Sequence, residues 1–128
     1  MEIREGRKHH SEYVVKEEHS AKAMGSGSVE VLSTPSLAAF MEGNCRDSLQ
    51  DMLPEGSMTV GTRIEIDHLK ASKIGAVILI ESEVTGIDGR LVHFRISAVD
   101  SGHLIGQAAH TRAIVDVARF MAGLNKKA

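Results

Sequence analysis

The longest periodic pattern in the chain is helical. Apolar side chains recur near a 3.6-residue spacing over residues 34–53, and the run closes at Pro54 and Gly56. At its start, Thr34 offers a capping hydroxyl and Pro35 occupies the first helical position, where its missing N–H costs nothing. The pattern therefore predicts a mostly buried helix of about five turns, with Thr34 as its N-cap.

After this helix the period changes to two, which is typical of β-strands. The side chains predicted to share one face of the first such strand are Val60, Thr62, Ile64, Ile66 and His68. Three further β-forming runs cover residues 76–84, 91–99 and 104–117, and Asp88-Gly89 is a hairpin signal between the first two. We expect these four strands to form a meander.

The two ends of the chain carry weaker patterns. Residues 1–12 are polar and are predicted to be frayed, so that a short first strand covers only residues 13–15. The Gly- and Ser-rich stretch 23–28 predicts a mobile loop, and a polar tail is expected after residue 117. The order of elements predicts an α+β fold in one domain, residues 1–128, with a single helix packed on an antiparallel sheet.

Composition and charge exclude several functional classes. No apolar run approaches the roughly 20 residues that cross a bilayer, and residues 1–15 lack the apolar stretch of a signal peptide, so we expect a cytoplasmic protein without a membrane partner. A net charge of -2 with scattered basic residues argues against binding to nucleic acid. Cys45 is the single cysteine, and it is expected to be a packed thiol in a reducing compartment.

Three polar side chains are candidates for chemistry. Glu42 lies within an apolar stretch of the helix, where a buried carboxylate is costly without a function or a partner. His68 ends the apolar face of its strand, and Thr34 begins the helix. Each has an ordinary structural explanation as an exposed glutamate, a core histidine or a cap. Together they offer the carboxylate, imidazole and hydroxyl that acyl transfer uses, beside the N–H donors of a helix N-terminus.

The stretch from residue 31 to 42, VLSTPSLAAFME, resembles the nucleophile and base segment of the fluoroacetyl-CoA thioesterase-like family of hot-dog-fold proteins. In that family a Thr at the helix start, a Glu eight residues later and a His twenty-six residues beyond the Glu form the catalytic set. Thr34, Glu42 and His68 reproduce both intervals. Residues 60–62, VGT, and 106–112, GQAAHTR, match two further blocks, so the resemblance extends over roughly residues 12–121.

The resemblance implies an α+β hot-dog fold with one long central helix on a five-stranded antiparallel sheet. It also implies hydrolysis of a small or medium acyl-CoA by a homodimer, which could assemble into a dimer of dimers, with its sites between subunits. Glu42 is implied to activate water or to attack the thioester, His68 to support proton transfer, and Thr34 to orient or join the attack. Gly61 would bring backbone close to the acyl group, and Arg112 would position the substrate. Neither a metal nor a redox cofactor is implied, because coenzyme A belongs to the substrate.

One departure from the family concerns the acyl group. Fluoroacetyl-selective members carry aromatic residues before the helix, whereas this chain has no Phe, Tyr or Trp between Tyr13 and Phe40. We therefore expect another small or medium acyl group. Two alternatives remain: a non-catalytic hot-dog protein that binds acyl-CoA as a sensor or carrier, and an enoyl-CoA hydratase. The hydratase would need an Asp and a His a few residues apart, whereas Asp67 and His68 are adjacent.

Overall fold

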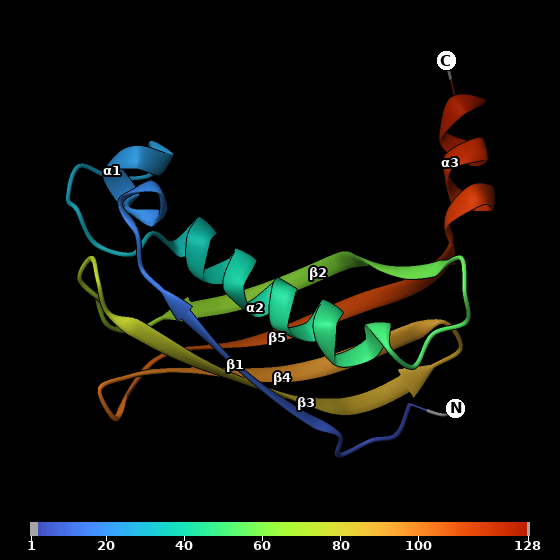
Figure 1. The fold of residues 1–128 in the computed structure, drawn as a ribbon, viewed down its shortest axis with the longest axis horizontal. Coiled ribbons are helices and arrows are strands. Elements are labelled where there is room, and N and C mark those ends of the chain that lie inside the picture. Colours follow the sequence, from blue (N-terminus) through green and yellow to red (C-terminus); the bar gives the residue numbers. More distant parts are fainter. Residues whose placement is uncertain (1–2, 128) are drawn as a thin grey trace.

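The computed structural model describes residues 3–127. Its elements are β1 (Lys8–Val14), η1 (Glu17–His19), α1 (Ala21–Met24), α2 (Thr34–Gln50), β2 (Ser57–His68), β3 (Val77–Asp88), β4 (Leu91–Asp100), β5 (His103–Asp116) and α3 (Val117–Asn125). The five strands form an antiparallel sheet, and α2 lies across one face of it (Figure 1). The predicted architecture of one long helix on a five-stranded antiparallel sheet is confirmed.

The order of the strands differs from the predicted meander. Strands β3, β4 and β5 follow one another, but β2 pairs with β5 and β1 pairs with β3, which gives the order β1-β3-β4-β5-β2. The prediction that β2 and β3 are neighbours is therefore wrong. As a consequence, β2 is an edge strand of twelve residues whose outer side pairs with no strand among residues 3–127.

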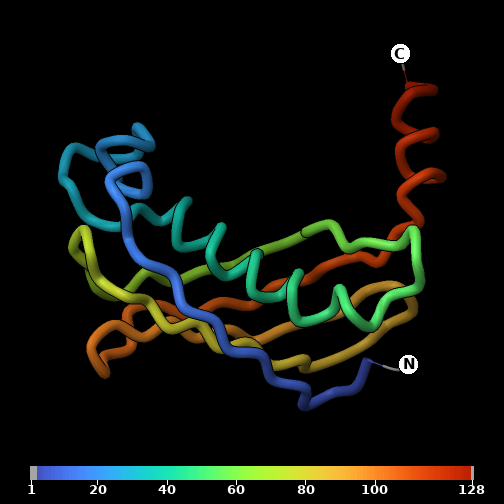
Figure 2. The backbone as a smooth tube through the Cα atoms, viewed as in Figure 1, coloured from blue at the N-terminus to red at the C-terminus, as the bar shows by residue number. Residues whose placement is uncertain are grey.

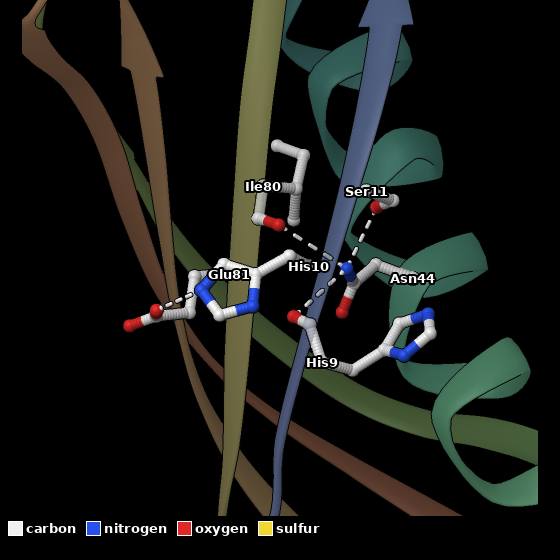
Figure 3. A network of polar contacts seen from close by, with 6 residues as sticks. All are labelled: His9, His10, Ser11, Asn44, Ile80 and Glu81. Atoms are coloured by element: carbon white, nitrogen blue, oxygen red, sulfur yellow. Dashed lines mark hydrogen bonds and ion pairs between the residues drawn. The ribbon is translucent and has the colours of Figure 1, made fainter.

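The first strand begins earlier than predicted. Residues 8–12 are polar, but they pair with β3, because an edge strand that exposes one face tolerates polar side chains. Figure 3 shows how this strand is held to the helix: the buried Asn44 of α2 donates from Nδ2 to Ser11 Oγ at 2.7 Å. The same nitrogen lies 3.3 Å from the carbonyl oxygens of His9 and Ile80. One amide thus joins α2 to both β1 and β3.

The helix α2 begins at Thr34, but its cap is Ser33. The Ser33 hydroxyl accepts a hydrogen bond from the Ser36 N–H at 3.1 Å, and its carbonyl accepts one from the Leu37 N–H at 3.0 Å. The predicted capping role of Thr34 is therefore wrong. Because Thr34 is already helical, the backbone of α2 does not engage its hydroxyl, which is available to another partner.

The inner side of α2 buries an apolar core against the sheet. Its buried members are Val15, Leu32, Leu37, Phe40, Met41, Cys45, Leu49, Ile78, Ile80, Val84, Val92, Phe94, Ile96, Ala98, Ile105 and Ala108. The Phe40 ring stacks on Tyr13 with centroids 4.7 Å apart and meets His19 edge-on at 4.9 Å. These aromatic contacts fix the N-terminal half of α2 against β1 and η1.

A short helix occupies part of the predicted loop 23–28. α1 is capped by the Ser20 hydroxyl, which accepts from the Ala23 N–H at 3.0 Å, and it ends at Gly25, whose φ of 73° is the left-handed conformation that terminates helices. The predicted absence of a regular element is therefore wrong for Ala23 and Met24. α1 stands beside the N-terminal end of α2 (Figure 1).

The polar tail expected after residue 117 is instead the helix α3. It begins after Asp116, whose side chain accepts from the Arg119 N–H, and it stands out from the sheet at the end where β2 begins (Figure 2). None of its residues is buried by the part of the chain that the structure describes, and Phe120, Met121 and Leu124 remain 38%, 46% and 44% exposed. Within residues 3–127, no helix is long and apolar enough to cross a membrane.

Candidate active site

A β-bulge in β2 decides which of its side chains face α2. Gly61 pairs with Arg112, and the next paired residue of β2 is Arg63, so that Thr62 is one extra residue in the strand. In a regular strand, Gly61 and His68 would point to opposite faces, as the predicted alternation requires, because seven positions separate them. The bulge shifts the alternation by one residue, so that Gly61 and His68 both face α2. The predicted assignment of side chains to faces is therefore wrong for the part of β2 that precedes Thr62.

Thr34 and His68 form one half of the candidate site. The Thr34 Oγ1 and the His68 Nδ1 lie 2.8 Å apart and share a hydrogen bond. The other ring nitrogen, Nε2, is buried and has no hydrogen-bond partner among residues 3–127. Burial lowers the pKa of His68, against an opposing effect of the Lys70 backbone, so the neutral form of the ring is favoured. This half of the site can therefore act in proton transfer.

The Thr34–His68 pair lies in an open pocket of about 410 Å³. Its other lining residues are Ala21, Ser26, Val31, Leu32, Ser33, Leu69, Lys70 and Ala71. The pocket is therefore built from three segments: the α1 loop, the start of α2, and the end of β2. Its walls contain no Phe, Tyr or Trp, in agreement with the aromatic-free stretch of the sequence.

Glu42, Gly61 and Arg112 form the other half. A Cβ atom placed on Gly61 would lie 3.1 Å from the Glu42 Oε2 and 3.4 Å from the Arg112 Nη1. The three residues line a second pocket, of about 320 Å³, together with Ala39, Gly43 and Arg46. Because Gly61 has no side chain, the carboxylate of Glu42 and the guanidinium of Arg112 approach the backbone of β2 closely.

Arg112 is held in place by three hydrogen-bonding contacts. Its Nε donates to Thr59 Oγ1 at 2.7 Å and its Nη2 to the Thr59 carbonyl at 2.9 Å, while Nη1 lies 3.2 Å from His110 Nε2. His110 is 1% exposed and was not predicted as a site residue. The signal in the sequence was its position two residues before Arg112 in a strand, which places both side chains on one face.

Neither the Cys45 thiol nor the start of α2 contributes strongly to the candidate site. Cys45 is a packed thiol, as predicted, and burial raises its pKa to about 12, so it is not a nucleophile at neutral pH. The N-terminus of α2 offers fewer oxyanion donors than expected, because Ser33 engages the N–H groups of Ser36 and Leu37, and Pro35 has none.

The predicted catalytic residues of one chain thus fall into two groups. Eight residues of helix separate Thr34 from Glu42, a distance of about 12 Å along the axis. Seven residues of strand separate Gly61 from His68, about 23 Å without the bulge. No hydrogen bond or ion pair joins Glu42 to His68 within residues 3–127. The predicted partnership of Glu42 and His68 is not formed inside a single chain.

We expect Gly61→Ala to lower turnover of an acyl-CoA substrate by roughly tenfold to 100-fold without unfolding the protein. The new methyl group would lie 3.1 Å from Glu42 Oε2 and 3.3 Å from His110 Cε1, so the carboxylate must move. Steady-state kinetics and a thermal melt measure the two effects. Gly86→Ala is the control, since a Cβ there would meet nothing closer than 3.6 Å among the described residues. Equal losses of turnover in both variants would contradict the role of Gly61.

Solved structures place the chain in a structural class. It superposes on a crystal structure of a single-site variant of the fluoroacetyl-CoA-specific thioesterase FlK with a TM-score of 0.94 at 25% identity, covering 100% of this chain and 99% of that one. A Thermus thermophilus protein described as a thioesterase superfamily member gives 0.90 at 26% identity, covering 98% and 93%. A hot-dog-like protein from Thermanaerovibrio acidaminovorans gives 0.89 at 20% identity, covering 96% and 91%. The fold is the hot-dog fold of this class of thioesterases.

Sequence comparison narrows the class to one family. The family model of the fluoroacetyl-CoA-specific thioesterases matches residues 15–118. The fluoroacetyl-CoA thioesterase of Streptantibioticus cattleyicolor is 30% identical over 98 residues, which are 77% of this chain and 70% of that protein. The chain belongs to the family of fluoroacetyl-CoA-specific thioesterases, which confirms the resemblance seen in its sequence blocks.

Proposed function

We propose that the protein hydrolyses the thioester of a small or medium acyl-CoA to the free acid and coenzyme A. Membership of a thioesterase family supports this function, and variants of the related FlK have been solved with fluoroacetate and CoA and with acetyl-CoA. The observation in this chain that carries the proposal is the Thr34–His68 hydrogen bond of 2.8 Å. A hydroxyl paired with an imidazole whose other nitrogen is unpaired is an arrangement suited to acyl transfer.

In the proposed reaction, Glu42 accepts a proton from a water molecule as the water oxygen bonds to the thioester carbon. The proton then passes from Glu42 to His68, which delivers it to the sulfur as the C–S bond breaks. Both groups thereby return to their starting protonation states. Thr34 would orient the imidazole, and Arg112 and the Gly61 backbone would stabilise the charge that develops on the carbonyl oxygen. A covalent route, in which Glu42 attacks the carbon and water then hydrolyses the acyl-enzyme, would use the same residues.

This reaction requires the two halves of the site to meet, and we propose that they meet across a homodimer joined along β2. β2 offers twelve residues of open edge, whereas the other edge strand, β1, has seven. A two-fold axis makes the two β2 strands antiparallel. An axis near Ile64 would bring the Gly61 region of one strand beside the His68 end of the other. Each site would then combine Glu42, Gly61 and Arg112 of one protomer with Thr34 and His68 of its partner.

The helix α3 supports the same interface. It stands next to the beginning of β2 (Figure 1), and its apolar side chains Phe120, Met121 and Leu124 remain partly exposed in the described part of the chain. A partner that pairs along β2 would approach this end of the molecule and shield them from water. Sedimentation distinguishes the dimer from a dimer of dimers.

The proposal includes no metal or redox cofactor, because Glu42, His68 and Thr34 supply the base, the proton carrier and the hydroxyl that hydrolysis needs. It includes no nucleic-acid or membrane partner, and it places the protein in the cytoplasm, where a lone reduced cysteine is common. A hydratase is disfavoured, because Asp67 is exposed on the face of β2 opposite His68.

The experiment that tests the function is a panel of CoA esters assayed with a thiol reagent. We expect acetyl-, propionyl- and butyryl-CoA to be turned over within about tenfold of one another, because an open pocket without aromatic walls discriminates weakly between methylene groups. The buried Cys45 should add little background, because burial suppresses its reactivity. Cleavage of fluoroacetyl-CoA alone would contradict this selectivity. Tight binding without any cleavage would favour the acyl-CoA carrier.

A further inference from the structure

His110 makes two contacts that together determine where its proton lies. Its Nδ1 is 2.7 Å from the carbonyl oxygen of Arg63, and its Nε2 is 3.2 Å from Nη1 of Arg112. A carbonyl oxygen only accepts hydrogen bonds, and a guanidinium only donates them. The ring therefore carries its proton on Nδ1, donates it to Arg63, and accepts from Arg112 through a bare Nε2.

The hydrogen bond from Arg112 to His110 is the third contact that holds the guanidinium in place. Thr59 accepts from Nε and Nη2, and His110 accepts from Nη1, so all three nitrogens of Arg112 are engaged on the sheet side. Arg112 nevertheless lines the pocket that contains Glu42. His110 lies behind that pocket, stacked on Phe94 at a centroid distance of 6.2 Å, and it is not among the residues that line it.

We infer that His110 is a positioning residue, which orients the Arg112 guanidinium toward the Glu42 pocket only while its imidazole is neutral. Protonation would place an N–H on Nε2, facing a guanidinium that has no lone pair to receive it. The hydrogen bond would be lost, and two positive charges would stand in contact. This inference rests on the proposed hydrolysis for its effect on turnover, but not for the geometry itself.

The surroundings of His110 favour the neutral ring. Burial is the main cause that lowers the pKa of His110, and Arg112 on the same strand lowers it further. The bond to the Arg63 carbonyl and the carboxylate of Glu42 on α2 act in the opposite direction. Two further titratable groups of α2 lie near this site: Cys45, which stays a neutral thiol, and Arg46, a cation that lines the Glu42 pocket. Phe94 on β4 carries no charge.

Two substitutions separate positioning from packing. His110→Gln keeps an oxygen that accepts from Arg112 but does not titrate, whereas His110→Leu keeps apolar bulk against Phe94 and removes the acceptor. We expect His110→Leu to lower kcat by about tenfold, and His110→Gln to recover most of that loss. On the acid side, the slope of log kcat/KM against pH should be smaller by one unit in His110→Gln than in the parent, because one protonation no longer lowers activity. His93→Gln, which alters a half-buried histidine on the opposite face of the sheet, should leave the profile unchanged.

Side-chain ¹⁵N spectra of the parent protein test the geometry without substrate. A proton on Nδ1 of His110, and an Arg112 Nε–H that exchanges faster in His110→Leu than in His110→Gln, would support the inference. A proton on Nε2, or identical acid limbs in the parent and His110→Gln, would overturn it. If the parent cleaves no CoA ester but shows the Nδ1 proton and this exchange pattern, the proposed function fails while the positioning of Arg112 stands.

Discussion

Glu42→Gln should reduce kcat for acyl-CoA hydrolysis by roughly 100-fold or more, because the amide keeps the shape of the side chain but cannot accept the proton of water. Glu42 is half-buried and shares its pocket with Arg112, so the neutral amide also removes a negative charge beside the guanidinium. Steady-state kinetics with the best CoA ester of the panel measure the loss.

The control for Glu42→Gln is Asp47→Asn, which removes an acidic group from the exposed side of the same helix. It should keep turnover near the parental value, and neither variant should melt much earlier than the parent. A Glu42→Gln protein that hydrolyses every tested ester at the parental rate would show that Glu42 is not catalytic. The acyl-CoA carrier would then become the better assignment.

Much of the fold could be predicted because the apolar residues show a clear helical spacing in α2 and a clear two-residue alternation in the strands. The spacing of Leu37, Phe40 and Met41 predicted α2, and alternation with turn signals predicted β2 to β5. Periodicity does not record which strands pair, so it could not show that β2 lies next to β5. Periodicity also could not show the bulge at Thr62. An extra residue in a strand is recognised only from its pairing with the neighbouring strand, which the sequence does not reveal.

The errors at the ends of elements have local causes. Ser33 and Thr34 both carry capping hydroxyls, and only the backbone geometry shows that Ser33 is the cap. The apolar residues of α3 stand at helical spacing, with Phe120, Met121 and Leu124 separated by one and three positions. Four lysine, arginine and asparagine residues flank them, which gives the segment the composition of a polar tail.

The sequence predicts a set of candidate site residues but not their arrangement in space. The intervals between Thr34, Glu42 and His68 match the family, and the structure brings Thr34 and His68 into contact. Within one chain, however, Glu42 lies about two turns of helix away from Thr34, and His68 lies seven strand residues away from Gly61. Glu42 and His68 are therefore far apart. Spacing along the sequence cannot distinguish a site within one chain from a site shared by two.

Mixed dimers distinguish these two arrangements. In a dimer of one Glu42→Gln chain and one His68→Ala chain, a shared site would pair the intact Glu42 of one protomer with the intact His68 of the other. The second site would carry both substitutions. Each variant alone has two damaged sites and should retain about 1% of parental turnover. If each site lay within one chain, the mixed dimer would also have two damaged sites.

Random reassembly of equal amounts of the two variants makes half of the dimers mixed, and one of the two sites in each mixed dimer is intact. The mixture should therefore recover about a quarter of parental turnover after joint unfolding and refolding. Separate refolding of the two variants, followed by assay in one tube, is the control for slow exchange. A chain with both substitutions should be little worse than either single variant, since the two residues act as a unit, and it should not restore activity to either. Recovery confined to the jointly refolded sample would establish that Glu42 and the partner's His68 serve one site, whereas turnover that stays near 1% would place each site within a single chain.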